Sequence, residues 1–135
     1  VQQLMMDIIP GQDAIAYIQR STQGTFDIFR LPLAGGPPSA LVESRPDKAE
    51  VRVSPDGRAM AFTATDGTRN DLYVVPLPIA SAPVVAAADL LGPPRWSRDG
   101  RRLFYLGPGN RVMTVAVQTT PLLAVGAPQP LFQLK

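Results

Sequence analysis

The stretch VRVSPDGRAMAFTA occupies residues 51–64, and a related stretch, PRWSRDGRRLFYLG, occupies residues 94–107. When Ser54–Arg58 is aligned with Ser97–Arg101, the two stretches lie 43 residues apart. Similarity at a fixed spacing of this length indicates that one supersecondary unit is used more than once. The repeat therefore serves to locate the strands and turns along the rest of the chain.

A third copy of the unit lies upstream. AIAYIQ at 14–19 matches AMAFTA at an offset of 45, and DIFRLPL at 27–33 matches DLYVVPL at 71–77 at an offset of 44. The first turn of this copy has diverged, because Pro-Gly-Gln-Asp at 10–13 stands where the other copies carry Asp-Gly-Arg. The chain therefore divides into three units, at about 1–43, 44–89 and 90–135.

Each unit is expected to form four short strands, which in the middle copy fall at about 50–54, 58–64, 71–77 and 83–88. Asp-Gly between the first two strands is a tight-turn signal, because glycine accepts the positive φ that such turns require. DLYVVPL is apolar on both sides, as a strand between two layers would be. The pattern predicts an all-β chain of three four-stranded antiparallel β-propeller blades.

Composition limits the classes of function. The 135 residues contain no Cys and no His, so this chain cannot build a disulfide, a thiolate metal site or a histidine general base. A net charge of +2 with dispersed basic residues argues against a nucleic-acid partner. No apolar run approaches the ~20 residues that a membrane helix needs. We expect a single domain without a metal, a cofactor, a catalytic centre or a membrane segment.

In the quoted residues the chain resembles the TolB-like and WD-like β-propeller repeats that carry a Ser-Pro-Asp-Gly turn. It is similar above all to the last blades of the C-terminal propeller of some bacterial serine/threonine protein kinases. The similarity spans about Asp13 to Phe132 and includes the turn, the Leu72–Pro76 strand and the Gly126–Phe132 ending. It implies a non-catalytic, extracytoplasmic or periplasmic module. Kinase activity is not implied, because the Gly-rich loop, His-Arg-Asp and Asp-Phe-Gly are absent from this sequence.

An arc of three blades leaves two blade faces uncovered, because closed propellers begin at four blades. Three arrangements would protect it: membership of a longer propeller, closure of two copies head to tail into a six-bladed ring, or capping residues. We expect a fragment of a longer propeller that dimerises when isolated. Within the arc, Trp96 takes the position of Val53 in the repeat and is expected to fill a seam between blades.

The polar residues of the repeat invite a catalytic interpretation, but a structural one is favoured. Asp56 and Asp99 are expected to bond the backbone of their own turns and, because they recur once per blade, to lie far apart. Ser54 and Ser97 have no His to activate them.

Two other polar segments are expected to be solvated loops. Asp66, Asn70 and Asp71 could offer oxygen ligands to Ca²⁺, but the segment lacks the alternating acidic order of a calcium loop. The four arginines between residues 95 and 102 are expected to be solvated turn charges, with a phosphate-binding patch as the alternative.

The connections that lead into the innermost strands, at 43–50 and 90–95, are expected to open near the propeller channel. Binding residues occur disproportionately on such loops. The residues expected to contact a partner are Arg45, Asp47, Lys48, Glu50 and Arg95.

The function expected from this pattern is non-catalytic binding or sensing of a protein or peptide ligand, in a fragment such as a kinase-linked propeller. A second copy of the chain is a further expected partner. Two alternatives remain open: the gating propeller of a prolyl-oligopeptidase-like peptidase, and an isolated repeat fragment with only an assembly role.

Overall fold

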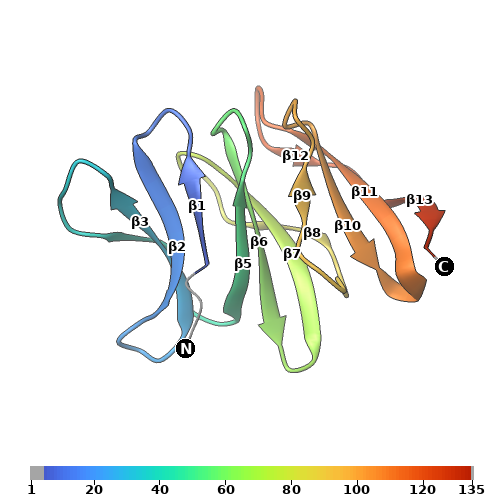
Figure 1. Ribbon diagram of the computed structural model, residues 1–135, viewed down its shortest axis with the longest axis horizontal. Coiled ribbons are helices and arrows are strands. Elements are labelled where there is room, and N and C mark those ends of the chain that lie inside the picture. The colour runs from blue at the N-terminus through green and yellow to red at the C-terminus, as the bar shows by residue number, and fades with distance from the viewer. Residues whose placement is uncertain (1–4, 135) are drawn as a thin grey trace.

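The computed structural model describes residues 5–134. In this range every regular element is a β-strand except the short 3-10 turn Pro108–Asn110, so the predicted all-β class is confirmed. The strands form three antiparallel sheets, called blades 1, 2 and 3 below, which stand one behind the other along the molecule (Figure 1). No helix in the described residues is long and apolar enough to cross a membrane.

Blades 1 and 2 have the predicted four strands, arranged across each sheet in chain order. Blade 1 contains β1 (Met6–Ile9), β2 (Ala14–Arg20), β3 (Phe26–Pro32) and β4 (Ser39–Val42). Blade 2 contains β5 (Asp47–Val53), β6 (Ala59–Asp66), β7 (Arg69–Pro76) and β8 (Val84–Ala87). Strand β5 begins about three residues before the predicted position, because Asp47 and Lys48 also pair with β6, beyond a register shift that interrupts the simple alternation.

Blade 3 departs from the prediction at its outer edge. It contains β9 (Arg95–Trp96), β10 (Arg102–Gly107), β11 (Arg111–Gln118), β12 (Ala124–Val125) and β13 (Gln129–Gln133). Both β12 and β13 pair with β11, one beside each end of it, so two short strands share the place of a fourth. Pro128 lies between them and has no N–H to donate, which explains why one continuous strand does not form there.

The seam between blades 1 and 2 holds the larger part of the core. Ile18 and Ile28 of blade 1 are buried against Val51, Met60 and Phe62 of blade 2. Ring stacking also stabilises this seam, since the ring centroids of Phe62 and Tyr73 lie 5.2 Å apart and the ring planes are nearly parallel.

The seam between blades 2 and 3 uses the opposite side of the same strands. Leu72 and Val74 face Leu103 and Val115, whereas Tyr73 and Val75, at alternate positions of β7, belong to the other seam. The prediction that DLYVVPL lies between two layers is therefore confirmed.

Trp96 packs against the seam between blades 2 and 3, as its place in the repeat predicted. Its indole Nε1 donates a hydrogen bond to the carbonyl oxygen of Arg52 at 3.0 Å. The partly buried indole thus has an apolar contact and a partner for its single donor.

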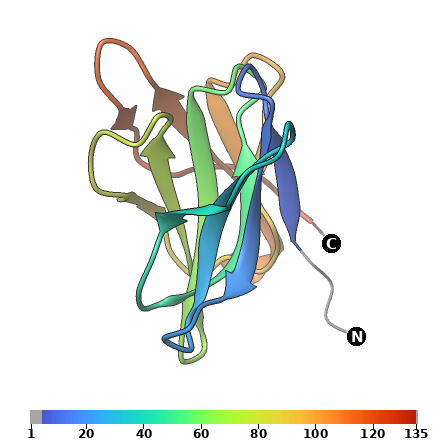
Figure 2. The same ribbon diagram turned by 90° about the vertical axis from the view of Figure 1, so that its left-hand side faces the viewer.

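The outer face of blade 1 is uncovered within the described residues, and it is apolar. Figure 2 looks onto this end of the molecule. Because Ala14, Ala16 and Ile18 point into the seam, the alternating side chains of β2 and its neighbours point the other way. Ile8 is 63% exposed and Leu33 is 55% exposed. Such a face is suited to covering by a further sheet.

Candidate functional site

The Ser-Pro-Asp-Gly turn of blade 2 is held together by its own side chains. Ser54 Oγ donates to Asp56 Oδ1 at 2.6 Å, and the Arg58 N–H donates to the same oxygen at 3.0 Å. The Ala59 N–H donates to Ser54 Oγ at 3.1 Å, and Gly57 closes the turn with a φ of 73°. The predicted role of Asp56 as a turn residue is confirmed.

Blade 3 repeats this geometry closely. Ser97 Oγ donates to Asp99 Oδ1 at 2.6 Å, the Arg101 N–H donates to that oxygen at 3.0 Å, and the Arg102 N–H donates to Ser97 Oγ at 3.0 Å. The structural role predicted for Asp99 is therefore also confirmed.

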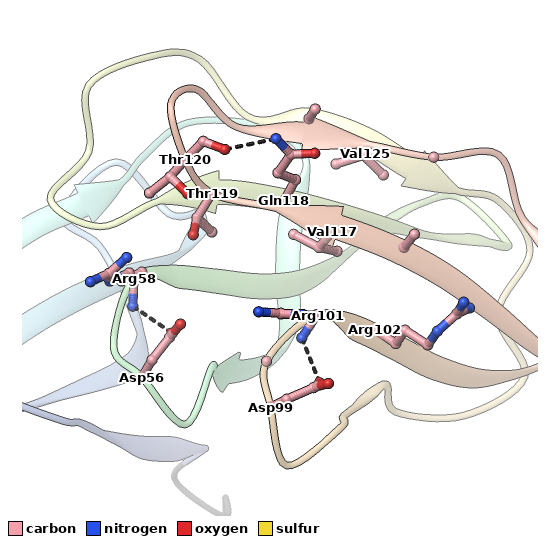
Figure 3. Close-up of a pocket in the computed structure, with 14 residues that line it drawn as sticks. Asp56, Arg58, Asp99, Arg101, Arg102, Val117, Gln118, Thr119, Thr120 and Val125 are labelled. Carbon is pink, nitrogen blue, oxygen red and sulfur yellow. Dashed lines mark hydrogen bonds between the residues drawn. The ribbon is translucent and has the colours of Figure 1, made fainter.

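The two turns lie against each other, which corrects the expectation that Asp56 and Asp99 are far apart. A Cβ atom added to Gly100 would lie 3.5 Å from Asp56 Oδ2. Both aspartates line one pocket (Figure 3). The expectation was wrong because consecutive blades stack face to face, so that equivalent turns become neighbours.

This pocket, called the turn pocket below, has a volume of about 960 Å³ and opens where the ends of blades 2 and 3 meet. One wall consists of the two turns, with the side chains of Arg58, Arg101 and Arg102. The other wall is the connection from β11 to β12, with Gln118, Thr119, Thr120 and the neighbouring residues Ala124, Val125 and Gly126.

The two carboxylates in the pocket are stabilised in their charged form. Partial burial acts to raise the pKa of Asp56, but the bonds from Ser54 and the Arg58 N–H outweigh it and hold the pKa below its ordinary value. The hydrogen bond from Ser97 lowers the pKa of Asp99, and the Arg101 N–H adds to the effect. The pocket thus contains carboxylates that stay ionised at neutral pH.

The residues predicted from loop 43–50 lie at the other end of the strands, and two of them join blade 2 to blade 1. Asp47 Oδ1 accepts a hydrogen bond from the Phe26 N–H at 3.0 Å. Lys48 is buried, with Nζ 3.5 Å from Asp27 Oδ1, and also donates to the carbonyl of Ser44.

The other predicted partner residues are more accessible. Glu50 lies 3.9 Å from Arg52 in a half-exposed pair, whereas Arg45 and Arg95 are exposed. Arg45 lines a smaller apolar pocket of about 370 Å³ between blades 1 and 2, whose wall includes Phe62 and Tyr73. Arg45 shares this pocket with Lys48 and a second one with Asp47, whereas Arg95 lies on blade 3. The proposed contacts of the five residues with a partner remain predictions.

In the acidic hairpin considered for Ca²⁺, the Asp71 carboxylate already accepts hydrogen bonds from within the chain. Asp71 Oδ2 accepts from Arg69 at 2.9 Å, and Asp71 Oδ1 accepts from the Asp89 N–H at 3.2 Å. Among residues 5–134 no group of three His, Cys, Asp or Glu side chains is placed to hold a metal ion.

Sequence reasoning missed Arg58 and the Gln118–Thr120 wall as site residues. A signal for the arginine was present, because Arg58 and Arg101 occupy the same place in the repeat. The wall carried no such signal, since the connection from β11 to β12 is distant in sequence from both turns.

The fold is similar to those of solved structures. TolB from Acinetobacter baumannii matches with a TM-score of 0.72 and 17% identity, over 98% of this chain and 33% of that one. A TolB protein from Agrobacterium tumefaciens matches with a TM-score of 0.71 and 19% identity, over 91% of this chain and 44% of that one. Acylaminoacyl peptidase from Pyrococcus horikoshii matches with a TM-score of 0.59 and 16% identity, over 96% of this chain and 26% of that one. No family model and no curated protein matches the chain.

At these identities the comparisons show a shared fold alone. The predicted resemblance to TolB-like β-propellers is confirmed at that level. The chain spans less than half the length of either TolB chain.

Proposed function

We propose that this chain is a non-catalytic β-propeller segment that binds a protein or peptide ligand. The observation that carries the proposal is the turn pocket, an open polar hollow built jointly by two blades. Its volume of about 960 Å³ lies near the top of the ~300–1,000 Å³ range of ligand sites. The absence of His and Cys from the sequence removes the usual activators of a serine and the usual thiol nucleophile from this chain.

The proposal includes a place in a larger protein. Similarity to TolB-like propellers supports an extracytoplasmic propeller. The sequence resemblance to kinase-linked propellers supports a sensing or interaction role. Reading the coding sequence on both sides of this segment tests the context. A membrane segment and a kinase upstream would support it.

The alternative is the propeller of a peptidase, which the similarity to an acylaminoacyl peptidase favours. In that case the hydrolase domain with its own nucleophile and base would lie elsewhere in the parent chain. A hydrolase domain encoded next to this segment would decide for this alternative. A purely structural role in assembly is the third candidate.

For the isolated segment we propose a second copy as a partner. Each terminal blade face offers roughly 300 Å², from strand spacing and length. Two such interfaces in a two-fold, six-bladed ring would bury about 1,200 Å² in total, at the lower end of specific interfaces. The exposure of Ile8 and Leu33 supports this proposal.

Selection of random-sequence peptides displayed on phage against the immobilised domain tests the binding function. We expect enriched peptides whose binding is lost in Arg58→Ala and Arg101→Ala. The matched control is Arg98→Ala, which removes an arginine of the same turn that does not line the pocket. Failure to enrich any peptide, or binding that is indifferent to both pocket changes, would overturn the proposal.

A further inference from the structure

In the turn pocket the aspartate carboxylates are engaged in hydrogen bonds, whereas the arginine guanidinium groups are not. Each aspartate accepts two hydrogen bonds within its own turn, from a serine hydroxyl and a main-chain N–H. In the hydrogen bonds among residues 5–134, Arg58, Arg101 and Arg102 take part through main-chain N–H and carbonyl groups and not through their guanidinium groups. The guanidinium groups of Arg58, Arg101 and Arg102 therefore have their donors available.

Three other arginines of the described chain differ in this respect, whereas Arg98 resembles the arginines of the pocket. Arg69 is paired with Asp71, Arg52 lies beside Glu50, and the Arg30 side chain donates to Gln12. None of the ion pairs within residues 5–134 includes an arginine of the turn pocket. The arginines that line this pocket thus make no direct ion pair, although Arg58 attracts Asp56 and Arg101 attracts Asp99 at longer range.

The charge in the pocket favours an anion of low charge. Arg58 and Arg101 are matched in number by the ionised Asp56 and Asp99, and the Arg102 side chain points away from the other two arginines (Figure 3). A guanidinium matches the planar carboxylate with two parallel hydrogen bonds. A phosphate group carries about −1.5 to −2 charges and would also face the carboxylates of Asp56 and Asp99. Carboxylate is therefore the anion that suits this wall.

The opposite wall offers neutral partners for a polypeptide backbone. Gln118 Nε2 donates to the Thr120 carbonyl at 2.7 Å and so holds the turn after β11 in shape. This leaves the Thr119 and Thr120 hydroxyls, which can both donate and accept, on the pocket side (Figure 3). Val125 and Ala116 add apolar surface to the lining. A cationic wall facing a neutral polar one suits an extended peptide with an acidic side chain or terminus.

We propose that the turn pocket binds a peptide segment through a carboxylate, held by Arg58 of blade 2 and Arg101 of blade 3. This inference rests on the proposed binding function and specifies the site and the chemistry of the ligand. A carboxylate held in this way would bridge two blades, so binding requires the seam between them to be intact.

Fluorescence anisotropy of the whole domain with short labelled Gly/Ser peptides tests the proposal. One probe carries glutamates and an amidated C-terminus, a second replaces each glutamate by glutamine, and a third is the glutamine peptide with a free C-terminal carboxylate. We expect the glutamate probe or the free-terminus probe to bind about 10- to 100-fold more tightly than the amidated glutamine probe, as charge-assisted bonds imply. The probe that binds more tightly shows whether the carboxylate comes from a side chain or from the C-terminus. The affinity of that probe should fall as salt is added.

Variants then locate the binding. Arg101→Gln and Arg58→Gln should each lower the affinity for the acidic probe about tenfold or more. Arg98→Gln removes the same charge outside the pocket and should change this affinity by no more than about twofold. Equal binding of all three probes, or equal losses in Arg98→Gln and Arg101→Gln, would overturn the proposal. Circular dichroism of each variant confirms that the fold is retained. If neutral peptides bind in an Arg101-dependent manner, the carboxylate inference is wrong although the binding function stands.

Discussion

A Cβ atom on Gly57 would lie 2.3 Å from the carbonyl oxygen of Pro10, so the turn of blade 2 rests directly on the diverged turn of blade 1. The next pair of blades repeats the contact more loosely, with Asp56 beside Gly100. Both glycines have a φ near +70°, at 73° and 72°. The repeated glycine therefore serves the turn conformation in both blades and close packing chiefly in blade 2.

Substitution of the two glycines should separate these roles. Gly100→Ala is expected to lower the free energy of unfolding by about 1–2 kcal/mol, the usual cost of a left-handed non-glycine residue. Gly57→Ala should lower it by about 2–5 kcal/mol, because displacement of the Pro10 backbone adds ~1–3 kcal/mol. Urea denaturation of both variants measures the difference. Equal losses would show that the turns do not touch as described.

The hydrogen bond between Trp96 and Arg52 gives a second prediction. Trp96→Phe keeps a ring in the seam but leaves the Arg52 carbonyl without this donor, so we expect a loss of about 0.5–1.5 kcal/mol. Trp96→Ala should cost about 3 kcal/mol, because it also removes the packing of the indole. Urea denaturation again measures both, and similar losses in the two variants would contradict the role assigned to the ring.

The buried pair of Lys48 and Asp27 should behave as a unit. Asp27→Leu leaves the buried Lys48 ammonium without its partner and is expected to lower the free energy of unfolding by about 3–5 kcal/mol. Lys48→Met should lower it by a similar amount, because the Asp27 carboxylate is then buried without its partner. The double variant should cost less than either single one, since neither charge is then stranded. A double-mutant cycle in urea checks this, and strictly additive losses would refute the coupling.

The lowered carboxyl pKa values predict a specific acid response. Because the folded pKa of Asp99 lies below its ordinary value of 3.8, its contribution to stability is complete above that pH and is lost as the pH falls through the folded pKa. Ser97→Ala removes the largest cause, so the pKa of Asp99 should rise toward 3.8. NMR titration of the side-chain carboxyl carbons measures it. Asp56, bonded to Ser54 instead, is the internal control and should not move.

The uncovered face of blade 1 predicts self-association of the isolated chain. We expect light scattering after gel filtration to give the mass of a dimer, and Ile8→Glu to shift the population to monomer, because a charge would be buried in the ring interface. Val85→Glu places the same charge on an exposed residue of the middle blade and should not change the mass. A monomeric wild-type chain at high concentration would exclude the six-bladed ring.

The sequence by itself determined the repeated unit, its four-strand pattern and its turn chemistry. These are local properties: Asp-Gly selects a turn, and alternating apolar residues select strands with two buried faces. Ser54, Asp56 and Gly57 sit within one short stretch, so their mutual hydrogen bonds could be read from their order. The position of Trp96 in the seam followed from the repeat in the same way.

Only the tertiary structure decided which turns meet and what gathers between them. Stacking of the blades brought Asp56 beside Gly100, and it placed Arg58 in the same pocket as Arg101 although 43 positions separate them in the repeat. It also buried Lys48, one of the residues predicted to contact a partner, beside Asp27 of blade 1. The reason is that contacts between blades depend on the angle and depth of sheet packing, which no local pattern of residues encodes.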